Sequence, residues 1–193
     1  CVSILVIIQW RLFIMEINDL ILDGLENLQR IIQRGIGGLT PEELKYQPHP
    51  DAQSVGMLYF QIVRVEDMAT HDTMGKKPLW ITEKWYQKLN IPIDADLGKM
   101  TQEQIAVFEL SKEWQAYATA VRNSTIKYVS GLKSNDFDRD VVVPTPPGQP
   151  APPPPLPFTP TVGGILIHML TELSCRAGKI EYIRGLHRLQ QCK

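Results

Sequence analysis

Several features that mark particular classes of protein are missing from this sequence. Its 193 residues carry 20 lysines and arginines against 21 aspartates and glutamates, without a basic block, so nucleic-acid binding is not expected. Cys1, Cys175 and Cys192 are the only cysteines, and they lack metal-type spacing. A disulfide framework is therefore not expected, and a reducing cytoplasm fits better. No glycine-rich phosphate loop, nucleophile elbow or catalytic triad is readable.

An apolar run long enough to span a membrane is also missing, although residues 1–15, CVSILVIIQWRLFIM, are strongly apolar. This stretch contains Arg11 and is shorter than the roughly 20 residues that a membrane-spanning helix needs. It lacks the basic start and the small-residue cleavage site of a secretory signal. We expect an atypical packing segment or a stretch without functional importance, the alternative being a processed lipoprotein terminus. No membrane span is predicted.

What the sequence does contain is helical periodicity. The first expected helix has one apolar stripe and closes at the glycines of residues 35–38; the stripe consists of Ile21, Leu25, Leu28 and Ile32. In LTPEEL, Thr40 and Glu43 have the spacing of a capping box, and Pro41 suits a first helical turn. This second helix must be short, because the prolines of QPHP follow almost at once.

A second long helix is predicted to begin near Ser54, with Gln61 in the middle of its apolar stripe. The stripe consists of Met57, Leu58, Val65 and Met68. We interpret Glu66 and Asp67, just beyond Gln61, as solvated or capping charges. The linking region that follows, residues 76–99, is expected to hold one short helix after Thr82.

The cleanest pattern predicts a third long helix of about 28 residues, which opens at the capping box TQEQ of Thr101. Its apolar positions recur at steps of three and four: Val107, Leu110, Trp114, Tyr117, Val121, Thr125 and Tyr128. We expect Trp114 and Tyr117, like Trp80 and Trp85, to be core residues rather than the lining of a pocket.

A proline-rich segment then precedes the last helix, which is expected over residues 160–189. Ten of the seventeen residues 144–160 are proline, so an extended polyproline II conformation is predicted. We interpret this segment as a stiff connector from one end of the bundle to the other; the alternative is a docking site for a proline-recognising module. Four long helices without a convincing strand predict one all-α domain over residues 1–193, a four-helix bundle.

The order of these features resembles the DinB-like four-helix-bundle superfamily, which includes bacterial damage-inducible proteins and thiol-dependent transferases. The resemblance covers residues 17–186. It depends on three stretches: GLTPEELKYQPHPDAQSVGMLYFQIVRVED, VRNSTIKYVSGLKSNDFDRDV and HMLTELSCRAGKIEYIRGL. It implies a DinB-like bundle that forms a homodimer.

Members of this family typically hold a divalent metal, often zinc or nickel, with three side chains. The resemblance places those positions at Gln61, seven residues after Ser54, and at Glu172 and Arg176, six and two residues before Gly178. Arginine has no lone pair to offer a metal, so no metal is predicted here. Glutamate four residues before arginine is the favourable order for a helical ion pair. We expect Gln61 to accept from Arg176 and to donate to Glu172.

Two functions are compatible with this pattern. The first is a DinB-like protein with a degenerate metal site and no cofactor, non-catalytic or binding an anionic or amide-bearing small molecule in the cleft between the second and fourth bundle helices. The second is a metal-dependent enzyme of the thiol S-transferase type, in which His168 joins Glu172 and either His49 or His71 in a reorganised zinc or nickel site. Cys175 is interpreted as a small buried apolar residue rather than a nucleophile.

Overall fold

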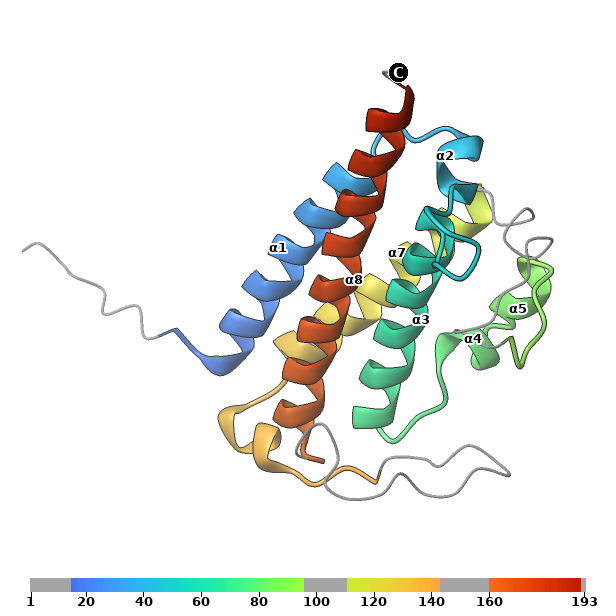
Figure 1. Ribbon diagram of the computed structural model, residues 1–193. Coiled ribbons are helices and arrows are strands. Elements are labelled where there is room, and N and C mark those ends of the chain that lie inside the picture. The colour runs from blue at the N-terminus through green and yellow to red at the C-terminus, as the bar shows by residue number, and fades with distance from the viewer. Residues whose placement is uncertain (1–14, 96–110, 143–159, 192–193) are drawn as a thin grey trace, which may run out of the picture.

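The computed structural model describes residues 15–95, 111–142 and 160–191, and every regular element in these parts of the chain is helical (Figure 1). The long helices are α1 (Ile17–Ile36), α3 (Val55–Thr73), α7 (Lys112–Ser130) and α8 (Val162–Gln191). The short ones are α2 (Pro41–Lys45), α4 (Leu79–Thr82), α5 (Trp85–Lys88) and the 3-10 helix η1 (Ser134–Asp138). The protein is an all-α bundle, as predicted.

The main core lies where α8 packs between α1 and α3 (Figure 1). All four residues of the stripe predicted for α1 are at most 4% exposed. They face the buried side of α8, formed by Ile165, Met169, Leu173, Ile180 and Ile183. The capping box of Thr40 and Glu43 is confirmed, and it starts the short helix α2.

The stripe predicted for α3 is only partly correct. Ser54 caps the helix as expected, with Oγ accepting from the backbone N–H of Met57. Met68, however, is 38% exposed and Val65 is half-buried. The buried positions include Gln61, Arg64, Glu66 and Asp67, because α3 is covered on several sides by α7, α8 and α4. A helix covered in this way buries polar residues that a one-sided stripe assigns to solvent.

An aromatic core fills the space between α3, α7 and the short helices. Trp80, Trp114, Tyr117 and Phe60 are fully buried there, and Trp85 is 8% exposed. The expectation that the four aromatic residues are core is confirmed. The linking region holds two short helices rather than one, since α4 ends at Thr82 and α5 follows it. The additional helix is α4, which begins where the Asp67 carboxylate of α3 accepts from its first backbone N–H. This contact joins residues 12 positions apart, so a local sequence pattern does not reveal it.

The single helix of about 28 residues predicted from Thr101 is wrong in extent. α7 begins at Lys112, because Ser111 is extended and its Oγ accepts from the backbone N–H of Trp114. The sequence therefore has a second, competing capping serine inside the predicted helix. The TQEQ capping box lies outside the described residues, as does the apolar segment 1–14.

The two ends of the proline-rich segment lie side by side. The backbone N–H of Val141 donates to Pro160 over 2.8 Å, and that of Val162 donates to Arg139 over 2.9 Å, around a single bridge between Asp140 and Thr161. A connector from one end of the bundle to the other is therefore wrong: the segment leaves and returns at the same place. Residues 143–159 lie outside the described parts, so the docking alternative stays a prediction. None of the described helices is long and apolar enough to cross a membrane.

Candidate functional site

The three substituted family positions meet on the surface between α3 and α8. Gln61 of α3 is 5% exposed, and the side chains of Glu172 and Arg176 on α8 are 41% and 22% exposed. Nη1 of Arg176 donates to Oε2 of Glu172 over 2.6 Å and to its backbone carbonyl over 3.1 Å. Nε of Arg176 donates to Oε1 of Gln61 over 3.4 Å. The predicted ion pair and the predicted acceptor role of Gln61 are therefore present, while donation from Gln61 to Glu172 stays a prediction.

Glu172 and Arg176 stand between two neighbouring hollows, because both line each of them together with Val65. The larger hollow, about 570 Å³, also contains Gln61 and Lys179. The smaller one, about 270 Å³, is more apolar, and Ile165, Met169, Met68 and Ala69 contribute to its wall. A guanidinium paired to a carboxylate thus faces two spaces in which a small molecule fits.

Cys175 corrects one prediction, because it is exposed rather than buried. The buried side of α8 includes Leu173 and Ala177, and Cys175 lies between them in sequence, on the opposite side. Its side chain lines the larger hollow next to Arg176.

The histidines named for a reorganised metal site are dispersed. His168 is half-buried and lines the smaller hollow, as does Asp72, whose carboxyl pKa is raised chiefly by burial. His49 is exposed and lies 3.4 Å from Asp51, and His71 is committed to a carboxylate within α3. Among the described residues no group of three or more His, Cys, Asp or Glu side chains could hold a metal ion. The histidines named for the zinc or nickel alternative are therefore not brought together here, and that alternative stays a prediction.

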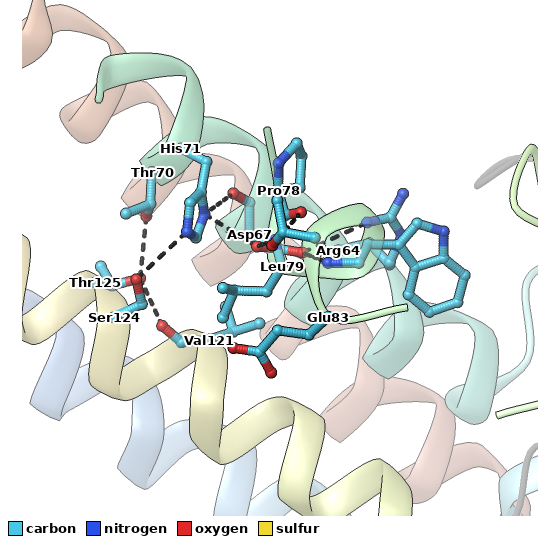
Figure 2. Close-up of polar contacts among 12 residues, drawn as sticks. Arg64, Asp67, Thr70, His71, Pro78, Leu79, Glu83, Val121, Ser124 and Thr125 are labelled. Carbon is cyan, nitrogen blue, oxygen red and sulfur yellow. Dashed lines mark hydrogen bonds and ion pairs between the residues drawn. The ribbon is translucent and has the colours of Figure 1, made fainter. Parts of the chain in front are cut away.

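A buried polar cluster at the C-terminal half of α3 is not predicted by the sequence pattern, in which Glu66 and Asp67 have the appearance of solvated or capping charges. Asp67 is fully buried and Glu66 is 2% exposed. Asp67 does cap a helix, but from inside: its carboxylate accepts from the backbone N–H groups of Leu79 and Trp80, both over 2.9 Å, at the start of α4 (Figure 2). Tyr117 of α7 donates to the same carboxylate over 2.8 Å.

His71 completes this cluster one turn further along α3. Its Nδ1 lies 3.0 Å from Oδ1 of Asp67 and 2.8 Å from the Asp67 carbonyl oxygen, so this nitrogen carries a proton (Figure 2). Burial opposes the charged imidazole, but the hydrogen bonds to Asp67 outweigh it and raise the His71 pKa. Burial also opposes the charged form of Asp67, and its hydrogen bonds from His71, Trp80, Tyr117 and Leu79 outweigh that effect, which lowers its pKa.

Asp67, His71 and Ser124 form a chain in the order of a hydrolase relay, since Nε2 of His71 lies 3.4 Å from Oγ of Ser124 (Figure 2). Acyl transfer also needs preorganised donors for an oxyanion. Ser124 lies in the interior of α7, where backbone N–H groups are used within the helix. We therefore interpret the chain as a structural tie between α3, α4 and α7. In the sequence its only local signal is the spacing of Asp67 and His71, one helical turn apart.

Comparison with known proteins supports the fold alone. No family model matches the sequence, and no curated protein matches it. A solved structure does: the crystal structure of a conserved protein from Enterococcus faecalis, with a TM-score of 0.69 and 19% sequence identity. The match covers 89% of this chain and 97% of that one. At this identity the likeness shows a shared helical architecture and does not extend to the chemistry of the hollows.

Proposed function

We propose that this protein is a DinB-like bundle that binds an anionic or amide-bearing small molecule between α3 and α8, without a metal ion and without catalysis. The observation that carries the proposal is the guanidinium of Arg176, held by Glu172 and Gln61 at a position where the resemblance implies a metal ligand. A guanidinium repels a cation and has no lone pair with which to ligate one.

The arrangement suits a ligand with both an acceptor and a donor. Nε and Nη1 of Arg176 make its hydrogen bonds to described residues, so Nη2 remains to donate to a carbonyl or carboxylate oxygen. The Glu172 carboxylate, which is 41% exposed, can accept from a ligand amide. Lys179 adds a positive charge to the larger hollow and favours an anionic group there. N-acetylglycine, which carries both an amide and a carboxylate, is the simplest probe.

The binding half of the proposal is tested by titrating N-acetylglycine and following backbone amide signals by NMR. We expect shifts at residues lining the larger hollow, and their loss in Arg176→Met. The matched control is Arg30→Met, because Glu26 and Arg30 form the same one-turn ion pair on the exposed side of α1, at 3.4 Å. Shifts that persist in Arg176→Met, or no shifts in the parent, would contradict binding at this site.

The metal half is tested by elemental analysis of the purified protein. We expect no stoichiometric zinc or nickel in the parent, and tight binding of one of them once Gln61→His and Arg176→His are combined. Arg30→His serves as the control for a histidine added to a helix surface. Stoichiometric metal in the parent would instead favour the alternative, a thiol S-transferase with a reorganised site around His168.

The resemblance also supports a homodimer, and the cysteine usage supports a cytoplasmic location. Light scattering on the full chain measures the first of these directly. A monomer over the accessible concentration range would remove the homodimer from the proposal and leave the binding site unchanged.

A further inference from the structure

A third cavity, away from the hollows of α3 and α8, is surrounded by positive charge. This cleft, of about 930 Å³, lies where α3 ends, between the turn that follows it, α4 and the second half of α7. Its lining includes Lys76, Lys77, Lys127, Arg139 and His71, and among the described residues it includes no aspartate or glutamate. The whole protein has a formal charge of -1, so this concentration of cations is local.

The lysines of the cleft are not used by the fold. Within the described parts of the chain, Lys76, Lys77 and Lys127 form no ion pair and donate no side-chain hydrogen bond. Lysines often stand near helix C-termini to satisfy the last carbonyl groups. Here other groups do this, since the Thr73 carbonyl accepts from Arg139 over 2.9 Å and from the Tyr128 hydroxyl over 3.2 Å.

Arg139 is held in place at the edge of the cleft. Its Nη2 donates to Thr73 and, over 3.1 Å, to the hydroxyl of Tyr128. Both bonds leave from one nitrogen of a group with five N–H donors, so the guanidinium is oriented while donors remain for a ligand. Ser124 and Tyr128 add hydroxyl groups, and Met74, Leu79 and Leu132 add apolar surface.

Two acidic residues of α3 that precede the cleft in sequence, Asp67 and Asp72, are absent from its described lining, as are Asp138 and Asp140, the exposed neighbours of Arg139. Asp67 is fully buried behind His71 and accepts from His71, Tyr117 and the start of α4. Asp72 lines the smaller hollow between α3 and α8 instead. No carboxylate among the described lining residues therefore competes with an incoming anion.

We propose that this cleft binds a small organic molecule carrying a phosphate monoester. Lysine and arginine are the side chains that proteins use for phosphoryl oxygens, and more than one uncompensated cation favours a doubly charged group over a single carboxylate. The apolar part of the lining accommodates an organic body. This site is independent of the proposed function, which concerns Arg176.

Calorimetric titration of the full chain with phenyl phosphate tests the proposal, with benzoate as the singly charged comparison. We expect phenyl phosphate to bind more tightly than benzoate, and its affinity to fall with added salt. Combining Lys76→Gln with Lys127→Gln should lower the affinity about tenfold or more, because each removes a charge-assisted contact. Lys112→Gln is the matched control, since Lys112 is exposed at the opposite end of α7, about 20 Å from Lys127.

The same phosphate chemistry occurs on free metabolites and on lipid headgroups, and a second arm separates them. Flotation with phosphatidylcholine vesicles containing phosphatidic acid reports headgroup binding, again against the double lysine variant. Binding of phenyl phosphate alone assigns a free organic phosphate, and binding to vesicles alone assigns a lipid headgroup. Failure of both, or equal affinity in the parent and in the double lysine variant, overturns the site. Arg176→Met should leave either result unchanged, so the two proposals fail separately.

Discussion

The hydroxyl of Tyr117 donates to Oδ2 of Asp67 over 2.8 Å, and both residues are fully buried between α3 and α7. Burial, and then the neighbouring Asp67 charge, raise the pKa of Tyr117, so the phenol stays protonated and remains a donor. The same carboxylate accepts from the first backbone N–H groups of α4. The Asp67 side chain of α3 therefore holds both α7 and the linking helices in place. Because it is a buried charge, each of these hydrogen-bond donors is needed to offset the cost of burying it.

Replacing Tyr117 by phenylalanine removes one of those donors and little volume. We expect Tyr117→Phe to lower the free energy of unfolding by about 1–3 kcal/mol, the usual cost of leaving a buried acceptor short of a partner. Urea denaturation followed by circular dichroism measures it. Tyr182→Phe, at a position that is 69% exposed, is the control and should change stability little. Equal stability of Tyr117→Phe and the parent would contradict the role given to this bond.

The His71–Asp67 pair predicts a stability that depends on pH in two windows. The pKa of His71 is raised on folding, so its contribution is complete below its unfolded value of about 6.5 and is lost as the pH rises through the folded value. The pKa of Asp67 is lowered, so its contribution is present above its unfolded value and is lost as the pH falls through the folded one.

Urea unfolding from about pH 6 to about pH 9 tests the histidine window. We expect the parent to lose stability over this range, and His71→Asn to lose less of it. His49→Asn is the control, because His49 is exposed on the loop before α3 and should preserve the parent's pH dependence. A pH dependence that is the same in His71→Asn as in the parent would assign the effect to other groups.

The helices with one buried stripe were readable from sequence, because their information is local. The α1 stripe and the capping box of Thr40 and Glu43 need only residues within a turn or two. The buried cluster was not readable, because three of the four residues that donate to Asp67, namely Leu79, Trp80 and Tyr117, lie between 12 and 50 residues away. A charge looks solvated in sequence whenever its partners lie on other elements.

The two candidate sites also differ in how far they could be predicted from the sequence. Glu172 and Arg176 are one turn apart on one helix, so their ion pair could be predicted, and the resemblance added Gln61. The cationic cleft draws Lys76 and Lys77, Lys127 and Arg139 from three separate segments. No basic block marks it in the sequence, so only the packing of α3 against α7 reveals it.

A second buried charge on α3 gives an independent prediction. Glu66 is 2% exposed and accepts from Nε and Nη2 of Arg122, each over 2.8 Å, while Nη1 of Arg122 donates to the Leu25 carbonyl of α1. We expect Arg122→Leu to cost about 3–5 kcal/mol, because it strands the Glu66 carboxylate. Glu66→Leu combined with Arg122→Leu should be more stable than Arg122→Leu alone. If the double variant loses as much unfolding free energy as the two single variants together, the pair is not coupled.

Substitution of two glycines, one facing α8 and one on it, is expected to change the stability in opposite directions. A Cβ added at Gly35 of α1 would lie 2.9 Å from Cγ2 of Ile180, which is fully buried, so the Ile180 side chain or the helix that carries it must shift. We expect Gly35→Ala to lower the free energy of unfolding by about 1–3 kcal/mol through overpacking. Gly178 of α8 is exposed and a Cβ there meets nothing within 4 Å, so Gly178→Ala should raise stability by about 0.5–1 kcal/mol through helix propensity. Urea denaturation of both variants decides the matter, because propensity alone would make both substitutions stabilising. A stabilising Gly35→Ala would mean that α1 and α8 do not approach as closely as this contact requires.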